Sequence, residues 1–348
     1  MASSPAPAPA CNLPAANIAV DASLEVDSQA GDSGYEDHAS SSDFGSEATS
    51  ISSSILNYEY ENGRRYHAFR AGQYAIPNDE AEQDRLDMMH HIYSLLLAGN
   101  LHLAPLKEPK RILDIGTGTG IWAIDMADAY RGAKVFGTDL SPIQPGWVPP
   151  NVEFFVDDAE SDWTFESKFD YIHVRGMAGS IQDWPRLINQ AYQALRPGGY
   201  FEILEGPRFD LTSDDGTYNK DTALWRFYEL ANKASKTVER SFSLDCDFAK
   251  EFKDAGFDDF NVTIKNLPLG TWPADKKMKE LGQWMTVMVN TGFEAYGLGL
   301  LTRVLGMDVD EAKQLFVDCA QEVRDRSVHG YFHMHIMIGR KAPEEEDC

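Results

Sequence analysis

Short apolar segments with strand character alternate with amphipathic helical segments from Arg111 onward, and this alternation constrains the fold more than any other feature of the sequence. Strands that are each followed by a helix pair in parallel, and a parallel sheet needs helices on both faces. The predicted strands and helices of this core are, in chain order, 111–115, 121–129, 134–139, 152–156, 169–175, 184–195 and 200–205. We therefore expect a doubly wound α/β fold.

The segments before this core differ from it in composition. Residues 1–53 are rich in Ser, Ala, Pro and acidic residues and carry few large apolar side chains, so we expect them to be disordered. Residues 54–107 are predicted to form a helical N-terminal cap. Its helix begins after Asn78 or Asp79 and ends near Leu97.

The main domain is predicted to span residues 108–340, followed by an acidic tail at 341–348. The elements expected after Glu205 are, in order, two helices at about 221–240 and 245–255, a strand at about 260–267, a helical insertion at about 274–327 and a last strand at 331–340. With these two strands the mostly parallel sheet has seven strands.

The chain is strongly acidic, since 31 Lys and Arg against 55 Asp and Glu give a formal net charge of −24. The first fifty residues contain acidic residues but neither Lys nor Arg, and they account for one third of this charge. The folded part is therefore acidic as well. Such a surface repels phosphate backbones, and we expect no direct binding of nucleic acid.

The cysteines and the apolar segments indicate the compartment. The cysteines are too scattered for a zinc site or a dense disulfide framework, and we expect no metal site. The N-terminus lacks a secretory or mitochondrial pattern, and no apolar stretch approaches the roughly 18–20 residues that span a bilayer. We expect a reduced cytoplasmic or nuclear protein without membrane insertion.

The first strand of the core turns into the first helix through the pattern D-x-G-x-G-x-G, from Asp114 to Gly120. Glycines at such a turn let the backbone approach a ligand closely. A P-loop would need Gly-Lys-Ser/Thr, and Ile121 stands where the dinucleotide fingerprint requires its third glycine. A carboxylate beside the turn opposes a pyrophosphate but suits a cationic ligand.

Two further acidic positions follow the next two strands. Asp139 ends the segment KVFGTD, where a carboxylate can accept hydrogen bonds from ribose hydroxyls. Asp158 and Ala159 follow the third strand, at a position suited to an adenine edge. Each carboxylate alone could be a loop or cap residue, but their order behind the glycine turn favours a nucleoside site.

These elements, together with FDYIHVRGM and LRPGGYFEILE, resemble the class I S-adenosylmethionine-dependent methyltransferases over about residues 110–267 and the final strand. A narrower resemblance covers about residues 54–205. There ENGRRYHAFRAGQYAIPNDEAEQDRL, GTDLSPIQPGWVPPNVEFFVDDAESDW and GSIQDWPRL resemble the fungal LaeA-like methyltransferases. That family includes regulators of secondary metabolism and development, some partnered with velvet-type or zinc-finger proteins, and tailoring enzymes of biosynthetic gene clusters.

The resemblance implies S-adenosylmethionine as the cofactor. The residues implied to line its methionine part are Asp114, Gly116, Thr117, Gly118 and Gly120. Asp139 would hold the ribose, and Asp158 with Ala159 the adenine.

The N-terminal motif of the family contains Tyr66, Arg70 and Tyr74. The resemblance suggests that they cover the cofactor, with Arg70 pairing with its carboxylate. The alternative is that these aromatic residues pack the N-terminal helix onto the domain.

The sequence assigns no catalytic residue. Methyl transfer is an in-line displacement at a carbon that the sulfonium already activates, so the protein mainly aligns the nucleophile. His173, His329, His333 and His335 are candidate bases, and each has a structural role as its simpler interpretation. Residues 175–177 lack the Asn/Asp-Pro-Pro-aromatic signature, which argues against methylation of adenine or glutamine nitrogen.

The insertion carries large apolar side chains that either cover an acceptor pocket as a lid or fill the core. These residues are Trp272, Trp284, Met285, Met288, Phe293 and Tyr296, and the glycines that would make a lid mobile are Gly292, Gly297 and Gly299.

We expect a methyltransferase with a protein or small-molecule acceptor. It would regulate fungal secondary metabolism or development through protein methylation or protein complexes. The partners implied are a velvet-type protein, a zinc-finger protein or a second methyltransferase-like subunit. The alternatives are a tailoring enzyme of a biosynthetic cluster and a cofactor-binding regulatory subunit with little activity.

Overall fold

The computed structural model describes residues 18–20, 24, 59–61, 64–66, 77–206, 210–237, 242 and 246–343. Most of the predicted disordered segment and of the acidic tail lies outside the described residues, as do Arg70 and Tyr74.

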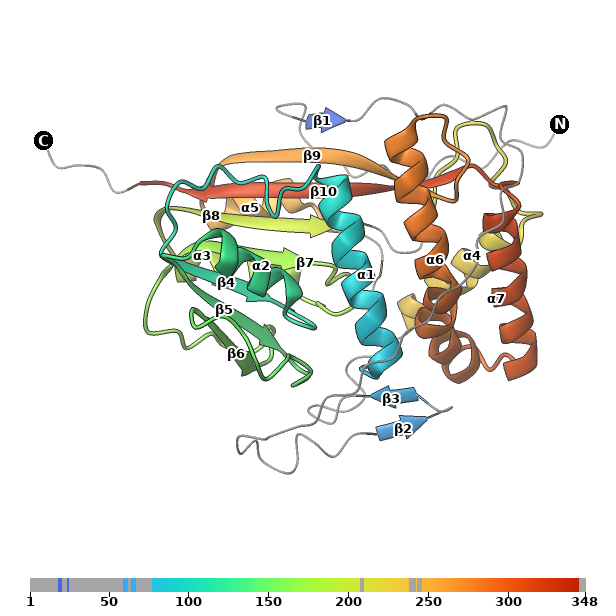
Figure 1. The fold of residues 1–348 in the computed structure, drawn as a ribbon, viewed down its shortest axis with the longest axis horizontal. Coiled ribbons are helices and arrows are strands. Elements are labelled where there is room, and N and C mark those ends of the chain that lie inside the picture. The colour runs from blue at the N-terminus through green and yellow to red at the C-terminus, as the bar shows by residue number, and fades with distance from the viewer. Residues whose placement is uncertain are drawn as a thin grey trace, which may run out of the picture.

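An eight-stranded sheet forms the centre of the molecule (Figure 1). Its order is β1–β9–β10–β8–β7–β4–β5–β6, and β10 is antiparallel to both neighbours. The strands are β1 Ile18–Val20, β4 Arg111–Ile115, β5 Lys134–Asp139, β6 Val152–Val156, β7 Phe169–Arg175, β8 Leu195–Glu205, β9 Phe257–Leu269 and β10 Gly330–Lys341. Strands β4 to β10 form the mostly parallel seven-stranded sheet that the sequence predicts, which confirms the fold class.

Three short strands come from the N-terminal part of the chain. Strand β1 forms one edge of the sheet and pairs in parallel with β9, although the sequence predicts disorder at these residues. Strands β2 Glu59–Glu61 and β3 Arg64–Tyr66 form a separate antiparallel hairpin.

Helices cover both faces of the sheet, as a parallel sheet requires. Helices α1 Glu80–Leu96 and α2 Ile121–Ala129 lie on one face, and α3 Trp184–Ala194 and α5 Phe248–Ala255 lie on the other. Each face has its own buried apolar cluster.

A second group of helices stands at the carboxyl end of the parallel strands, beside α1 (Figure 1). It consists of α4 Ala223–Thr237, α6 Lys276–Leu298, the π-helix η1 Gly299–Val304 and α7 Val309–Arg324. Helices α6 and α7 lie within the predicted insertion between β9 and β10. These helices close the end of the sheet at which ligands bind in α/β folds.

Local sequence signals start and stop these helices. Aspartate side chains accept first-turn N–H groups at the N-caps of α1, α3, α5, α6 and α7. Helix α3 ends at Ala194, and β8 begins with Leu195 in an extended conformation, ψ 146°. The strand thus starts five residues before the predicted Tyr200, and Pro197 also disfavours helical backbone at Arg196, the residue before it.

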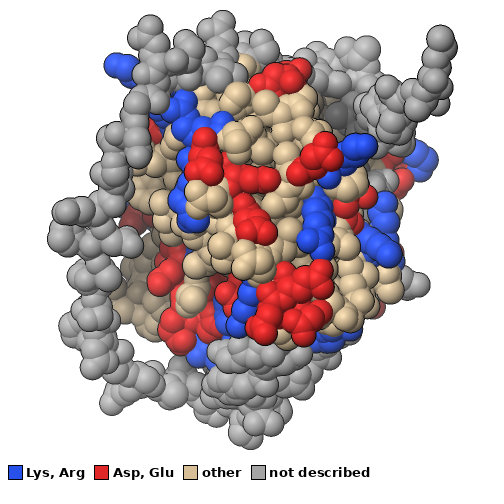
Figure 2. Space-filling view, turned by 90° about the vertical axis from the view of Figure 1, so that its right-hand side faces the viewer, with Lys and Arg blue, Asp and Glu red and all other residues tan. Residues whose placement is uncertain are grey.

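The face that α6 and α7 present to solvent carries acidic and basic side chains side by side (Figure 2). One such pair joins Arg226 of α4 to Glu311 of α7 at 2.7 Å. In the described part of the chain, no helix combines the length and apolarity needed to cross a membrane.

Candidate cofactor and acceptor site

The carboxyl ends of β4, β5, β6 and β7 meet where the order of the strands reverses, since β4 has β5 on one side and β7 on the other. A crevice at such a reversal is the usual ligand site of an open α/β sheet. Two adjoining cavities lie there. The larger extends from the glycine turn to α1, α4 and α6, and the smaller lies over the ends of β5 and β6.

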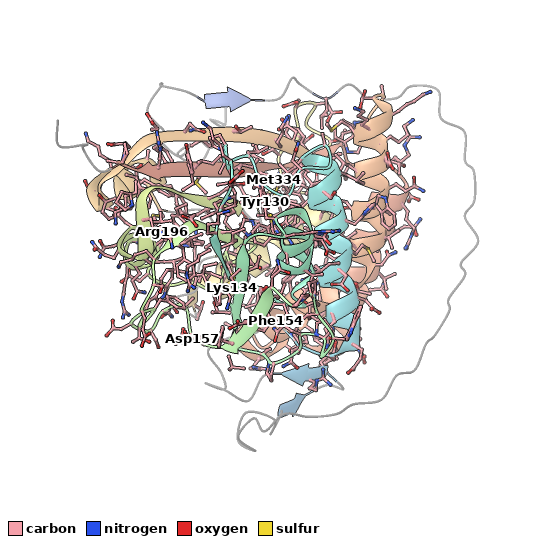
Figure 3. All side chains as sticks on the ribbon, turned by 60° about the vertical axis from the view of Figure 1, so that its left-hand side comes forward. Tyr130, Lys134, Phe154, Asp157, Arg196 and Met334 are labelled. Atoms are coloured by element: carbon pink, nitrogen blue, oxygen red, sulfur yellow. The ribbon has the colours of Figure 1, made fainter. Side chains whose placement is uncertain are left out.

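The glycine turn has a left-handed backbone, with φ of 69° at Gly116, 58° at Gly118 and 81° at Gly120. A Cβ atom at Gly116 would lie 2.1 Å from Sδ of Met177, and one at Gly120 would lie 2.4 Å from Cζ of Phe154. Phe154 projects from β6 (Figure 3). The glycines are therefore required by the packing of Met177 and Phe154 as well as by backbone conformation.

The carboxylate of Asp114 stabilises this turn through two hydrogen bonds. Its Oδ2 accepts the Thr117 hydroxyl at 2.7 Å, and its Oδ1 lies 2.8 Å from Nδ1 of His173. The His173 ring stacks on Trp122 with centroids 3.8 Å apart. Burial lowers the pKa of His173, so a neutral ring donates Nδ1–H to Asp114. This arrangement supports the structural interpretation of His173.

Asp139 lies between the two cavities and lines both. Its Oδ2 accepts the N–H of Gly118 at 2.8 Å, and its Oδ1 accepts the N–H of Ser141 at 2.9 Å. Burial raises the pKa of Asp139 above its ordinary value, while these hydrogen bonds favour the ionised form. The carboxylate is thus fixed at the strand end where the sequence predicts a ribose.

The smaller cavity contains the predicted adenine residues Asp158 and Ala159. Asp158 shapes its own turn, because its Oδ1 accepts the N–H of Glu160 at 2.9 Å. The carbonyl of Ala159 accepts the indole N–H of Trp163 at 3.0 Å. The structure therefore brings Asp139, Asp158 and Ala159 together along one continuous crevice.

The N-terminal hairpin is fastened to the start of α1. Arg64 donates from Nε to Oδ2 of Asp79 at 2.6 Å, and Arg65 donates from Nη2 to the carbonyl of Asn78 at 2.7 Å. Asn78 lines the larger cavity, and its side-chain amide donates to Oγ of Ser141 at 3.3 Å. These contacts hold the start of α1 over the end of the crevice where the sequence predicts the nucleoside.

That Tyr66, Arg70 and Tyr74 cover the cofactor stays a prediction. Tyr66 belongs to β3, but its side chain lies outside the described residues, as do Arg70 and Tyr74. Arg64 and Arg65 come from the same motif, and the sequence analysis missed them. The sequence feature that marks these two residues is a pair of adjacent arginines upstream of Asp79, the N-cap of α1.

At the end formed by α4, α6 and β10, the larger cavity is an apolar chamber. Its wall includes Met285, Met288, Phe293 and Tyr296 of α6, as expected of a lid. Aromatic side chains of α4 and β10 complete it, chiefly Phe227, Tyr228 and Phe332.

The two tryptophans of the lid hypothesis do not line this chamber. Trp272 is 2% exposed and donates its indole N–H to the carbonyl of Leu269 at 3.1 Å, so it fills the core. Trp284 packs on the outer side of α6 against the ring of His91, at 4.6 Å between centroids. Of the three glycines, Gly292 lines the chamber, whereas Gly297 packs against Phe227.

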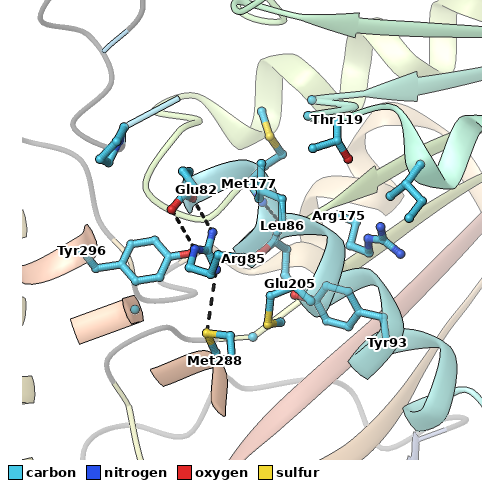
Figure 4. Close-up of a pocket in the computed structure, with 18 of the residues that line it drawn as sticks. Glu82, Arg85, Leu86, Tyr93, Thr119, Arg175, Met177, Glu205, Met288 and Tyr296 are labelled. Carbon is cyan, nitrogen blue, oxygen red and sulfur yellow. Dashed lines mark hydrogen bonds and ion pairs between the residues drawn. The ribbon is translucent and has the colours of Figure 1, made fainter. Parts of the chain in front are cut away.

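A buried ion pair closes one side of the chamber (Figure 4). Arg85 contacts both carboxylate oxygens of Glu82, at 2.6 and 2.9 Å, and both side chains are at most 3% exposed. The Arg85 guanidinium also reaches Sδ of Met288 at 3.9 Å and lies 4.7 Å from the ring centre of Tyr296. The pair therefore joins α1 to α6.

Two more charged side chains line the cavity at the ends of β7 and β8. Arg175 donates from Nη2 to Nδ1 of His90 at 3.1 Å, and burial lowers its pKa. Glu205 is 1% exposed and accepts the backbone N–H of Met177. No sequence motif predicts a cofactor role for either residue.

The remaining candidate histidines lie away from this cavity. His329 contacts Asp215, and Nδ1 of His333 contacts Oδ1 of Asn266 at 2.9 Å. Burial lowers the pKa of His335 to about 4. None of the three lines the larger cavity.

The crevice suits a cationic nucleoside better than a dinucleotide. The N–H of Thr117 is bonded to the carbonyl of Thr138 at 2.9 Å and that of Gly118 to Asp139, so neither can serve a pyrophosphate. Carboxylates line the crevice instead. S-adenosylmethionine, a cationic nucleoside without a pyrophosphate, suits this arrangement.

The fold and this site define a class I S-adenosylmethionine-dependent methyltransferase, and a family described as a methyltransferase domain matches residues 70–262. The chain is 45% identical to methyltransferase pytC of Aspergillus terreus over 305 residues, which cover 87% of this chain and 94% of that protein. It belongs to the fungal LaeA-like methyltransferases.

Two further relatives are named for regulation or for an acceptor. The secondary metabolism regulator LAE1 of Cochliobolus heterostrophus is 40% identical, covering 81% of this chain and 94% of that protein. The protein-methionine methyltransferase laeA of Emericella nidulans is 37% identical, covering 82% and 76%. A solved structure, phosphoethanolamine N-methyltransferase 2 of Haemonchus contortus, is 20% identical with a TM-score of 0.43, covering 74% and 52%.

Proposed function

We propose that this methyltransferase regulates fungal secondary metabolism by methylating an uncharged, apolar acceptor group. The observation that supports this acceptor class is the chamber beyond the glycine turn, where Met285, Phe293 and Phe227 surround the space next to the cofactor site. An apolar group loses little on entering this part of the chamber, whereas a charged group would be desolvated there among apolar side chains.

The residues of the chain have to orient two molecules and exclude water. The bound cofactor supplies a methyl group that its sulfonium already activates. Asp114 and Thr117 fix the turn beneath the site, and Asp139, which the N–H of Gly118 holds in place, would bind the ribose. The Glu82–Arg85 pair and Met288 keep the chamber closed between α1 and α6.

A protein side chain is the first acceptor that we propose, and the name of the relative laeA, a protein-methionine methyltransferase, supports it. A methionine thioether carries no proton. Its sulfur would form a bond to the methyl carbon while the bond to the cofactor sulfur breaks, and the positive charge would pass to the acceptor. Such a transfer needs no base, consistent with a site in which His173 is a structural residue.

The proposed regulator would work with a protein partner. The family resemblance favours a velvet-type protein, a zinc-finger protein or a second methyltransferase-like subunit, in the cytoplasm, the nucleus or both. Replacing Asp139 by Ala should abolish cofactor binding and leave such a complex intact in a pull-down. Joint loss of both would contradict a separate regulatory role.

A small apolar metabolite is the second candidate acceptor. The enclosed aromatic wall of α4 and α6 favours it, because small-molecule sites are concave and mostly apolar. The protein would then be a tailoring enzyme.

Incubation with cofactor labelled in its methyl group distinguishes these candidates. Purified protein is mixed with fungal extract, and the protein and small-molecule fractions are counted separately. Label in the protein fraction supports the regulator, and label in the metabolite fraction supports the tailoring enzyme. The Asp139→Ala variant is the control and should transfer no label. Cofactor binding without label in either fraction would contradict both and favour a regulatory subunit with little activity.

A further inference from the structure

Arg175 places a positive charge at the wall of the cofactor crevice. It ends β7, lines the larger cavity and lies on the opposite side of the chamber from Arg85 (Figure 4). Its guanidinium donates to Nδ1 of His90 at 3.1 Å and lies 4.8 Å from the ring centre of Tyr93. Among the described residues, it forms no ion pair with a carboxylate.

The other arginine of the chamber differs in this respect. Arg85 forms a bidentate ion pair with Glu82, so its charge is already compensated. The hydrogen bond to His90 orients the guanidinium without pairing it directly with a carboxylate, because His90 lies between Arg175 and Asp125, which it contacts at 2.9 Å. Asp114 and Asp125 act on the guanidinium only from a distance. A half-buried cation held in this way is suited to an anionic ligand group.

The strand order indicates which group that is. Across the carboxyl edge of the sheet the order is β6, β5, β4 and β7, carrying in turn Asp158, Asp139, the glycine turn and Arg175. A nucleoside with adenine at Asp158 and ribose at Asp139 extends over the glycine turn toward β7. Its amino-acid end therefore arrives next to Arg175.

We propose that Arg175, in place of the Arg70 that the family resemblance suggests, binds the α-carboxylate of the cofactor's methionine moiety, held in place by His90 and Tyr93. This inference rests on S-adenosylmethionine as the cofactor. The guanidinium supplies two parallel N–H donors to a carboxylate, which a lysine ammonium cannot match in geometry. The sulfonium and ammonium groups of the same ligand would face the carboxylates that line the crevice.

Calorimetry with two ligands tests the proposal without a methyl acceptor. S-adenosylmethionine and decarboxylated S-adenosylmethionine differ only in the carboxylate. The wild-type protein should prefer the complete cofactor by about 10- to 100-fold, the range of a charge-assisted contact. Arg175→Gln should bind the complete cofactor that much more weakly and the decarboxylated ligand within about twofold of wild type.

The variants separate a carboxylate contact from damage to the fold. Arg175→Lys retains the charge and should keep part of the preference. Arg111→Gln is the matched control, because this arginine packs on Phe136 and Phe169 rather than in the crevice. It should leave the preference unchanged.

The outcomes are distinguishable. A wild-type protein that binds both ligands equally, or an Arg175→Gln variant that keeps the wild-type preference, would overturn the role of Arg175. If Arg175→Gln does not fold, Arg175→Lys and the wild-type preference decide the question. Binding of neither ligand by the wild type would instead refute S-adenosylmethionine as the cofactor.

Discussion

Asp114 and His173 occupy paired positions on β4 and β7, and their side chains form a 2.8 Å hydrogen bond directly beneath the glycine turn. Both side chains are at most 4% exposed. Because Asp114 also accepts the Thr117 hydroxyl, one carboxylate joins the sheet, the turn and the Trp122–His173 stack.

This relationship predicts the effect of replacing Asp114 by Asn. The amide has the same size but offers one oxygen to two donors, so one buried hydrogen bond is lost. We expect a loss of about 1–3 kcal/mol in the free energy of unfolding, measured in urea, and weaker binding of S-adenosylhomocysteine. Asp128→Asn on the exposed side of α2 is the control. Equal effects of both substitutions would refute the bracing role.

Gly120→Ala tests the packing of the turn. A Cβ there would lie 2.4 Å from Cζ of Phe154, and the backbone has a φ of 81°. The steric clash and the left-handed conformation both disfavour a side chain at this position. We expect about 2 kcal/mol or more of destabilisation by urea unfolding. At Gly146 no atom lies within 4 Å of an added Cβ, so Gly146→Ala should change stability by less than about 0.5 kcal/mol. A tolerated Gly120→Ala would show that the turn adjusts freely.

Met288 and Trp284 both lie on α6, but we expect their replacement by Ala to affect acceptor turnover differently. Met288 lines the chamber and contacts Arg85, so Met288→Ala should change acceptor turnover while the dissociation constant for S-adenosylhomocysteine stays within about twofold. Trp284 faces His91 outside the chamber, and Trp284→Ala should leave both quantities near wild type. Parallel loss of turnover and cofactor affinity in Met288→Ala would indicate damage to the fold.

The buried carboxyl group of Glu202 should make the free energy of unfolding depend on pH. It is fully buried on β8 and accepts the N–H groups of Leu103 and Ala104, and burial raises its pKa from 4.5 to about 7. The folded protein therefore holds a proton that the unfolded chain has released between these values. The contribution of Glu202 to stability falls as the pH rises through this interval and stays low above it.

Glu202→Gln removes this titration. We expect a flatter dependence of the unfolding free energy between about pH 4.5 and 7, and a more stable protein than wild type above about pH 7. Urea unfolding at a series of pH values measures both. An unchanged slope in the variant would assign the dependence to other groups.

Local patterns predicted the parts of the site that depend on single segments. The positions of α2 and of β4 to β7 were predicted closely, because each is a short segment with one clear period and a glycine or aspartate at its end. Gly116, Gly118 and Asp139 were placed in the same way. A turn between a strand and a helix at the centre of a parallel sheet leaves few alternative positions for its residues.

The contacts that complete the chamber join segments far apart in the chain, and no local pattern encodes them. Arg85 meets Met288 from 203 positions away, and Arg175 meets His90 from 85 positions away. The periodicity of α6 marked Trp284 and Met288 equally as apolar. Only the packing of α6 against α1 decides that Met288 points inward and Trp284 outward.

Helices α6 and α7 lie between β9 and β10 in the chain. The residues predicted to bind the nucleoside instead follow β4, β5 and β6. If the chamber selects the acceptor, as proposed, its α6 wall can thus diverge without disturbing the residues proposed to bind the methyl donor. A chimaera that receives residues 270–329 from another family member should inherit that member's acceptor choice and retain its own donor affinity.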